Sequence, residues 1–557
     1  MKQTASKLRF TSASPVPGPV LSLSASWPPV ITPTTNPISE EALLQGILKA
    51  QTRVYDVCVQ TPLQFAPRLS AQLGNRVYLK REDQQPVFSF KLRGAYNKMA
   101  SLTEAQLKKG IVTCSAGNHA QGVALSAKSL GINNVIVMPK ATPAIKVDAV
   151  KNFGGNAVLF GDNFDQAQTE AMRLSKEEGR TLVHPFDDVE VICGQATIGI
   201  EISKQLPRNE ELHAVFCCVG GGGLLAGVAS YLKRISPEVQ VFGVEACDAA
   251  CMTRSFEAGK SLTLPSVGLF ADGAAVRTPG KYTFDLCRAH ADGMITNTTD
   301  EICQAIKAGF NDCRTVMEPA GALGIAGLVR YVKTTGIKNK TLIAVTSGAN
   351  MDFDRLRFVS ERADVLECFG AATIPERPGS FWDFYMAIFP RNVTEFSYRM
   401  ISPDAEHAHV LVGWQTSPNA ANPQADVLAA MQAKNIKFEI IGEDDELSKT
   451  HLRHMVGGRA PTVTRERVFR FEFPERPGAL KEFLEGLFRP AIRPFNITLF
   501  HYRSHGADVG RVFAGFSVRQ GKEEEEFEEF LADLCSEQRG FSGYEETGNQ
   551  FYQSFLH

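Results

Sequence analysis

The feature that most constrains the fold is an alternation, from about residue 50 to residue 365, of short apolar β-branched segments with amphipathic helical patterns. Such an alternation is typical of βαβ units, in which a largely parallel sheet is covered by helices. The sequence therefore predicts an α/β body over residues 51–365. We expect its strands at residues 77–79, 111–114, 135–138, 157–160, 214–219, 239–244 and 342–346.

Small polar loops follow three of these expected strands. The loops begin at Ser115, Gly220 and Ser347. Parallel sheets bind ligands at the carboxyl ends of their strands. We therefore expect the three loops to meet at one site.

The last third of the chain contains an internal repeat. The sequence Pro-Glu-Arg-Pro-Gly occurs at residues 375–379 and again at 474–478, and Asn392-Val-Thr-Glu-Phe-Ser-Tyr-Arg is echoed by Asn496-Ile-Thr-Leu-Phe-His-Tyr-Arg. Two copies about 100 residues apart indicate a duplicated small domain rather than a solenoid. Each copy predicts an α+β unit, with strand, turn, helix and strand, at 373–455 and 468–557.

Residues 1–50 form a separate segment. No acidic residue precedes Glu40, whereas Lys2, Lys7 and Arg9 are basic and Ser, Thr and Pro are abundant. This composition is typical of an organelle transit peptide, and its alternative is a disordered extension without an address. If the segment is a transit peptide, its composition favours a plastid over a mitochondrion. If it is not, we expect the protein in the cytoplasm.

Composition excludes several classes of function. The net charge is −2 with no Lys/Arg run, so nucleic acid is not an expected partner. The apolar run 214–232 contains Gly220, Gly221, Gly222 and Gly223, which argues against a membrane span. Twelve cysteines without a C-x-x-C pair predict buried free thiols rather than a disulfide framework or a zinc site.

Lys91 is the candidate nucleophile. Its neighbours Phe88, Phe90 and Leu92 are apolar, and an apolar environment favours the neutral amine that a Schiff base requires. The alternative, from this feature alone, is a surface lysine with a buried stem.

The glycine loop is the candidate phosphate site. Four successive glycines before Leu224 allow backbone N–H groups to turn toward an anion at a helix N-terminus. The loop lacks the pattern of a nucleoside-triphosphate or dinucleotide site, so we expect a smaller phosphate ester; the alternative is a flexible turn.

Two polar side chains complete the candidate site. Asn118 offers a donor and an acceptor at a strand-to-helix corner, and Ser347 offers a neutral hydroxyl. The pattern around His119 fits a packed or supporting side chain at least as well as a catalytic base.

Taken together, these motifs resemble the biosynthetic threonine dehydratases, which are pyridoxal-phosphate enzymes of the tryptophan-synthase-β fold group (fold type II). The resemblance runs from about Val54 to the C-terminus and rests on 89–95, 115–122, the tetraglycine, 347–350 and the two repeats. It implies elimination of ammonia from L-threonine to give 2-oxobutanoate, the committed step of isoleucine biosynthesis, with activity also on L-serine. It further implies a homotetramer.

The resemblance also assigns roles to residues. It implies that Lys91 links covalently to pyridoxal 5'-phosphate and acts in catalysis, and that Ser347 faces the pyridine nitrogen. The other implied cofactor contacts are Asn118, Gly220, Gly221, Gly222, Gly223 and Leu224. The implied substrate contacts are Ser115, Ala116, Gly117 and His119.

The repeats resemble ACT-like domains. This resemblance implies that isoleucine inhibits the enzyme and that valine opposes this inhibition. Tyr398 and Tyr502 occupy equivalent positions and are the candidate effector residues by resemblance, whereas strand periodicity alone favours core tyrosines.

No metal site is expected, because Cys251 stands where some serine-active relatives have a metal-binding Asp.

Two other interpretations remain open. One is a catabolic serine/threonine dehydratase or a racemase, against which the duplicated C-terminal module argues. The other is a catalytically silent amino-acid sensor, against which the intact set Lys91, Asn118, tetraglycine and Ser347 argues.

Overall fold

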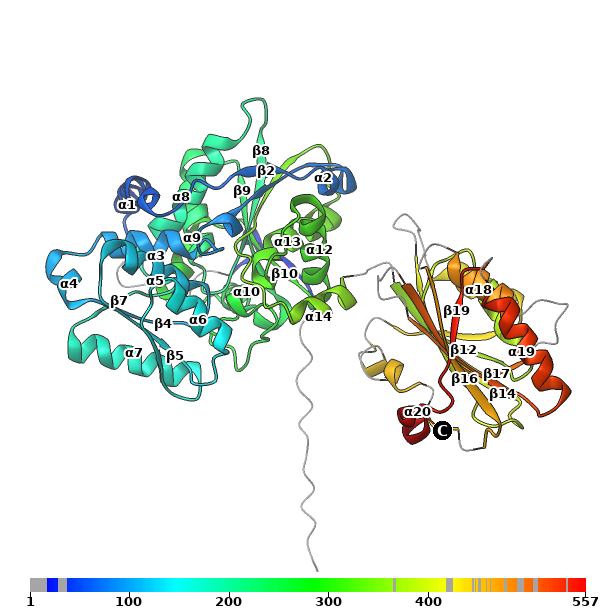
Figure 1. Cartoon of the computed structure of the whole chain (residues 1–557). Coiled ribbons are helices and arrows are strands. Elements are labelled where there is room, and N and C mark those ends of the chain that lie inside the picture. The colour runs from blue at the N-terminus through cyan, green and yellow to red at the C-terminus, as the bar shows by residue number, and fades with distance from the viewer. Residues whose placement is uncertain are drawn as a thin grey trace, which may run out of the picture. The chain divides into compact units, whose positions relative to one another are not determined.

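The computed structural model describes residues 18–28, 38–363, 367–416, 424–442, 445, 447–448, 452–456, 458–460, 462–474, 478–487, 495–503, 509–536 and 539–556. The chain divides into two compact units, Met1–Ala363 and Asp364–His557. Each unit is described by itself (Figure 1).

The first unit contains two sheets. The seven-stranded sheet has the order β1-β10-β9-β8-β11-β3-β2. Its inner strands pair in parallel, and its outermost strands β1 and β2 are antiparallel to their neighbours. Its strands are β1 (Leu21–Leu23), β2 (Leu63–Phe65), β3 (Arg76–Lys80), β8 (Leu212–Cys218), β9 (Gln240–Ala246), β10 (Gly293–Asn297) and β11 (Thr341–Val345).

The smaller sheet is parallel, with the order β6-β5-β4-β7. Side chains alternate between the two faces along its strands. Ile136 packs with α5 (Asn118–Leu130) and α6 (Ala144–Asn152), whereas Val135 and Val137 pack with α7 (Phe164–Glu178). The strands are β4 (Ile111–Cys114), β5 (Asn134–Met138), β6 (Ala157–Leu159) and β7 (Thr181–Leu182).

Helices cover both sheets. On the large sheet α8 and α9 lie on one side and α12 and α13 on the other (Figure 1). The helices of this unit are α1 (Glu40–Arg53), α2 (Pro67–Leu73), α3 (Lys91–Ala100), α4 (Glu104–Lys109), α5 (Asn118–Leu130), α6 (Ala144–Asn152), α7 (Phe164–Glu178), α8 (Val189–Gln205), α9 (Gly223–Ile235), α10 (Cys251–Glu257), α11 (Lys281–His290), α12 (Thr299–Cys313), α13 (Pro319–Thr335) and α14 (Arg355–Arg362).

All seven strands expected from the sequence are present, within two residues at each end. The expected extension over 1–50 is too long, because β1 pairs with β10 and α1 contributes Leu43, Ile47 and Ala50 to the core. These short or weakly apolar segments become ordered through partners far along the chain. The remainder of the expected transit peptide, 1–17 and 29–37, lies outside the described residues.

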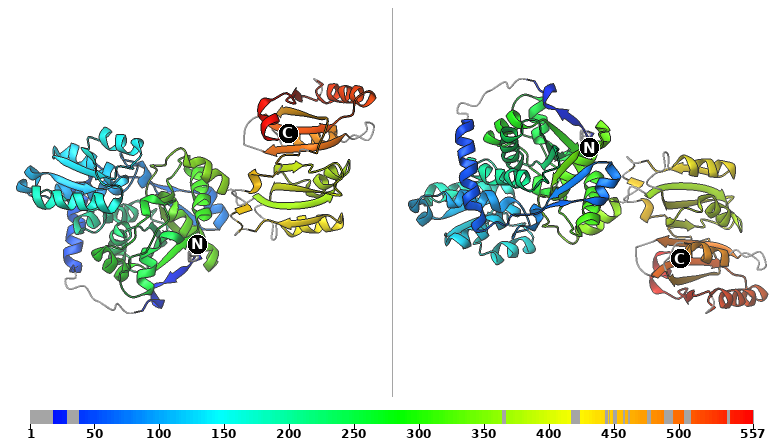
Figure 2. Two further views of the ribbon diagram at one scale, coloured as in Figure 1. Left: turned by 90° about the horizontal axis from the view of Figure 1, so that it is seen from below. Right: turned by 90° about the horizontal axis from the view of Figure 1, so that it is seen from above.

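The second unit is one antiparallel sheet of eight strands, in the order β15-β12-β14-β13-β17-β18-β16-β19. Strands β12 (Glu367–Pro375), β13 (Val393–Arg399), β14 (His407–Gln415) and β15 (Lys437–Ile440) come from the first repeat. Strands β16 (Glu466–Pro474), β17 (Asn496–Arg503), β18 (Val509–Ser517) and β19 (Ser542–Glu545) come from the second. The strand order of the second half mirrors that of the first. The two halves lie side by side in Figure 2, in yellow-green and orange-red.

The two repeats join through β13 and β17, where Phe396 pairs with Tyr502 and Tyr398 with Phe500. Helices α15 (Ser380–Ile388), α16 (Ala425–Ala433), α18 (Ala479–Leu487) and α19 (Lys522–Leu534) share one core with the sheet. Tyr552 of α20 (Gln550–Phe555) packs with Val468 and Leu499 in a separate cluster. Each repeat starts earlier than expected, at β12 and β16, and has four strands rather than two.

No helix in the described parts of the chain has the length and apolarity needed to cross a membrane.

Candidate active site

The candidate site is formed by loops from both sheets, since β4 belongs to the smaller sheet and β8 and β11 to the larger one. Hydrogen bonds of Asn118 with Asn350 and of Cys218 with Ser347 bring the loops that follow these strands together. Ser115 follows β4, Gly220 follows β8 and Ser347 follows β11. Lys91 begins α3, directly after a loop in which Phe88 has φ of 56°.

The Lys91 amine is held by a backbone carbonyl. Its Nζ donates to the carbonyl oxygen of Pro185 at 2.8 Å and lies 5.3 Å from the centre of the Phe90 ring. Burial lowers the pKa of Lys91 to about 8, although Cys218 and Glu318 nearby oppose this shift. About a fifth of the amine is therefore neutral at pH 7.4, far more than for a lysine with an ordinary pKa, and the neutral amine is the form that a covalent carbonyl adduct requires.

Buried ion pairs fix the helix that carries Lys91. Arg93 donates to Glu82 through Nε and Nη2, both at 2.7 Å, and to Glu201 through Nη1 at 2.6 Å. Lys80 also donates to Glu201, at 2.5 Å. All four side chains are fully buried, so the removal of any one would leave an uncompensated charge.

The glycine loop leads into a helix N-terminus that has no side-chain cap. Gly222 is the N-cap of α9 and has φ of 97°, which favours glycine. A Cβ at Gly221 would lie 2.3 Å from the Phe186 ring, and one at Gly220 would lie 3.0 Å from Ala274 Cα. The first N–H groups of a helix have no acceptor within it, so this end of α9 can bind an anion.

Asn118 has both ends of its amide engaged. Its Nδ2 donates to Glu318 Oε1 at 2.6 Å, and its Oδ1 accepts from Asn350 Nδ2 at 2.7 Å. Ser347 accepts from the Cys218 thiol at 3.2 Å and donates to the Ala320 carbonyl at 3.3 Å.

The sequence analysis missed Glu318, Asn350 and Cys218. Glu318 is the N-cap of α13, and burial raises the pKa of its carboxyl to about 7, against the hydrogen bond from Asn118. Asn350 follows the Ser347 loop and Cys218 ends β8. A signal existed for both Cys218 and Asn350: Cys218 lies two residues before the glycine loop, and Asn350 lies within the motif 347–350, although no role was assigned to its side chain. Glu318 had no such signal.

The expected substrate loop divides into two parts. Ser115 to Asn118 are half-buried at the site, whereas the His119 side chain is buried and its Nε2 donates to the Val183 carbonyl at 3.0 Å. Burial lowers the pKa of His119 to about 3, so the ring stays neutral. Its imidazole therefore packs inward, and only its backbone is available to a ligand.

In the segment from Glu245 to Cys251, where the sequence predicts no metal site, hydrogen bonds hold the carboxylate of Glu245. Glu245 accepts from the backbone N–H groups of Met252 and Thr253, at 2.9 and 2.8 Å, and from the Thr253 hydroxyl at 2.6 Å. These donors direct the carboxylate to the start of α10.

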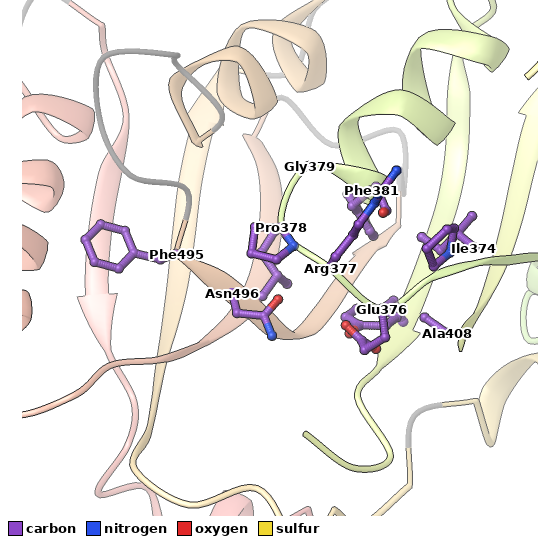
Figure 3. Close-up of a pocket in the computed structure, with 13 residues that line it drawn as sticks. Ile374, Glu376, Arg377, Pro378, Gly379, Phe381, Ala408, Phe495 and Asn496 are labelled. Atoms are coloured by element: carbon purple, nitrogen blue, oxygen red, sulfur yellow. The ribbon is translucent and has the colours of Figure 1, made fainter. Parts of the chain in front are cut away.

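A second candidate site lies in the repeat unit, at the first Pro-Glu-Arg-Pro-Gly loop (Figure 3). Tyr398 lines this pocket, and its hydroxyl donates to both Glu376 oxygens, at 2.8 and 2.7 Å. Phe495 to Ile497 of the second repeat complete it. Tyr502 is buried, stacks on Phe473 at 6.5 Å between ring centres, and does not line this pocket.

Known proteins that resemble this chain identify the class of protein to which it belongs. Residues 54–348 match the model of the pyridoxal-phosphate-dependent enzymes. Residues 360–452 and 457–556 match the C-terminal regulatory domain of threonine dehydratase. The relative from Burkholderia multivorans named L-threonine dehydratase biosynthetic is 50% identical over 92% of this chain and 99% of its own length. Its chloroplastic counterpart in Arabidopsis thaliana is 48% identical over 86% of this chain and 79% of its own length.

Solved structures agree with this assignment. The processed form of threonine deaminase isoform 2 from Solanum lycopersicum is 47% identical and covers 60% of this chain and 97% of its own, with a TM-score of 0.57. The chain thus belongs to the pyridoxal-phosphate-dependent enzymes of fold type II and, within them, to the biosynthetic threonine dehydratase family.

The residues present fit the cofactor. A phosphate matches the N-terminus of α9, which has no side-chain cap. Any residue larger than glycine at position 221 would collide there with the Phe186 ring. An aldehyde matches the Lys91 amine, whose pKa, lowered to about 8, makes more of it neutral than in an ordinary lysine.

Proposed function

We propose that this protein removes ammonia from L-threonine to give 2-oxobutanoate, and that isoleucine inhibits it through the repeat unit. The observation that carries the first part is the half-buried Lys91 amine, which donates to the carbonyl of Pro185, next to Phe186, the residue against which the glycine loop before α9 packs. The names of the relatives support threonine as the substrate.

The residues of this chain would act as follows. Lys91 Nζ would hold the cofactor covalently and, once the substrate amine has replaced it, take the α-proton of threonine. The N–H groups of Gly220 to Leu224 would bind the phosphate, and Asn118 Nδ2 the phenolic oxygen. When bound, pyridoxal phosphate supplies the electron sink for the pair that the α-proton leaves.

Ser347 would meet the pyridine nitrogen with a neutral hydroxyl. An aspartate there would favour a protonated nitrogen, whereas a hydroxyl leaves it neutral. The half-buried loop of residues 115–118 would bind the substrate carboxylate. Loss of the β-hydroxyl as water and hydrolysis of the released enamine give 2-oxobutanoate and ammonia. L-Serine would give pyruvate by the same steps.

The test is 2-oxo-acid formation from L-threonine by the purified protein. We expect Lys91→Ala to lower the rate by at least about 10³-fold, because it removes both the covalent attachment and the base. Lys49→Ala, which changes an exposed lysine of α1, is the matched control. A wild-type protein that binds the cofactor yet forms no 2-oxo acid would favour an amino-acid sensor instead.

The pocket at Tyr398 supports the effector part of the proposal. Glu376 offers a carboxylate to an ammonium group, Arg377 a guanidinium to a carboxylate, and Ile374 and Phe381 apolar surface to a side chain. A free apolar amino acid has these three features.

Removal of the Tyr398 hydroxyl tests this pocket. Tyr398→Phe frees the Glu376 carboxylate from the hydrogen bond that the hydroxyl shares between its two oxygens, worth about 1.5–3 kcal/mol with a charged partner. We expect the isoleucine concentration for half-inhibition to change by about tenfold or more, and the opposing effect of valine to change with it. Tyr544→Phe, at an exposed tyrosine of β19, is the control. An unchanged isoleucine response would place the effector elsewhere.

Location and assembly complete the proposal. The names of the plant relatives place them in the chloroplast and those of the yeast relatives in the mitochondrion, which supports an organelle for this chain, with a plastid favoured by composition. A fusion of residues 1–50 to a fluorescent protein tests the address. We propose a homotetramer, which light scattering of the purified protein tests.

A further inference from the structure

The amide of Asn118 is fixed from two sides by residues of two other loops. Glu318 accepts from Nδ2 at 2.6 Å and Asn350 donates to Oδ1 at 2.7 Å. Glu318 and Asn350 lie 200 and 232 residues away along the chain. Neither has a role in the function proposed above.

Both partners are themselves held in place. The Glu318 backbone N–H donates to the Gly348 carbonyl at 3.2 Å, and a Cβ at Gly348 would lie only 2.1 Å from Glu318 Oε1. Asn350 Nδ2 also donates to the carbonyl of Val87 at 3.0 Å, four residues before Lys91. The pair therefore connects Asn118 to the Ser347 loop and to the segment that carries Lys91.

This arrangement permits one orientation of the amide. If the Asn118 amide turned over, its oxygen would face the Glu318 carboxyl and its NH₂ group would face that of Asn350. Both hydrogen bonds would be lost, and like groups would oppose each other. In the observed orientation Nδ2 keeps a second hydrogen, while Oδ1 is occupied.

We propose that Glu318 and Asn350 are positioning residues that make Asn118 a hydrogen-bond donor toward the phenolic oxygen of the cofactor. The inference rests on the proposed function, because it requires pyridoxal phosphate at this site. A donor at that oxygen favours its anionic form. The pair thus sets the protonation and the absorption spectrum of the bound cofactor as well as its affinity.

Asn350→Asp is the decisive variant. It replaces the donor toward Asn118 Oδ1 with an acceptor, while Glu318 still accepts from Nδ2. Neither orientation of the amide then satisfies both partners, so the donor toward the cofactor is no longer fixed. We expect the dissociation constant for pyridoxal phosphate, measured by titration of the apoprotein, to rise at least tenfold. The visible band of the bound cofactor shifts, and the pKa that governs this band rises.

Glu318→Gln is the conservative control, since its Oε1 still accepts from Asn118 and its size is unchanged. We expect its cofactor affinity and spectrum to stay within about threefold and a few nanometres of wild type. Glu318→Leu, which cannot accept, is expected to resemble Asn350→Asp. A general loss of folding would affect Gln and Leu alike, so this contrast separates the two causes.

A double-mutant cycle tests whether the effect passes through Asn118. In an Asn118→Ala background, Asn350→Asp is expected to change the cofactor dissociation constant by less than twofold. A full effect in that background would overturn the proposal, as would wild-type affinity and spectrum in Asn350→Asp. If that variant does not fold, the contrast between Glu318→Gln and Glu318→Leu decides in the same way.

The two proposals fail differently. A wild-type protein that does not bind pyridoxal phosphate would refute the function proposed above. Variants that behave as a cofactor-binding, active wild type does would refute only the role of Glu318 and Asn350.

Discussion

Burial at Lys91 opposes the charge of its amine, and this has a consequence for cofactor binding. The pKa lies at about 8 instead of 10.5. We expect the rate of pyridoxal-phosphate incorporation into the apoprotein to rise with pH up to about 8 and then level off, because the neutral amine is the nucleophile. A lysine with an ordinary pKa would give a rate that still rises at pH 10. Stopped-flow absorbance from pH 6 to 10 measures this profile.

Stability of the apoprotein provides a second readout of the same pKa. Between pH 8 and 10.5 the unfolded chain holds the Lys91 proton and the folded chain has released it, so this residue makes stability rise with pH in that window. Below pH 8 both states are protonated, and the cost of the buried charge is fully present. Lys91→Met removes this contribution. Its melting temperature should therefore exceed that of wild type at pH 7, with the difference narrowing toward pH 10.5.

Among single residues, the sequence allowed us to select those that lie in local motifs. Lys91, Asn118, the tetraglycine and Ser347 each occur in a recognisable run of small or apolar neighbours. The loops after β4 and β11 come from different sheets and meet through the hydrogen bond between Asn118 and Asn350. Glu318 lies far from every motif along the chain, and its role follows only from its 2.6 Å contact with Asn118. Contacts of this kind depend on tertiary structure, which local patterns do not encode.

Among the elements, strand β1 differs most from expectation. It lies within a Ser- and Pro-rich segment, and its three residues are too short for a periodic signal. Its order comes from pairing with β10 and from Trp27, whose ring lies 4.3 Å from Phe256 and under the Arg288 guanidinium at 4.8 Å. The strands inside the sheet were predictable because burial on both faces requires continuous apolar runs.

Truncation tests the contribution of β1. Removal of residues 1–17 is expected to leave the melting temperature unchanged. Removal of residues 1–28 exposes the β10 edge and the face of Phe256, and we expect it to lower the melting temperature by a few degrees, because a partly buried aromatic contact and three strand pairs are lost. Equal melting temperatures for the two truncated proteins would show that β1 contributes nothing. A transit peptide, if present, is accordingly expected to end before Leu21.

For the molecule as a whole, the duplication was predictable from two nearly identical loops, but the joined sheet was not. Each repeat has β13 or β17 as an outer strand with unpaired backbone groups, and pairing of the two strands removes both edges. The equivalent residues Tyr398 and Tyr502 therefore lie on neighbouring strands, each beside a phenylalanine of the other repeat. A sequence pattern gives the strand content of a repeat, whereas the choice of partner for its outer strand depends on the complete fold.

The division into two units predicts that catalysis and its control can be separated. Among the residues that the structure describes, none beyond Ala363 belongs to the core clusters around the sheets of the first unit, and the candidate active site lies within the same unit. A chain that ends at Ala363 is therefore expected to deaminate threonine at a rate within about tenfold of the full chain and to show no response to isoleucine up to millimolar concentrations. The full chain carrying Tyr398→Phe serves as the comparison, because it alters the effector pocket and keeps the unit. A truncated protein that is still inhibited by isoleucine would place the effector site in the first unit. One that folds and binds pyridoxal phosphate but has no activity would show that the second unit contributes to catalysis directly.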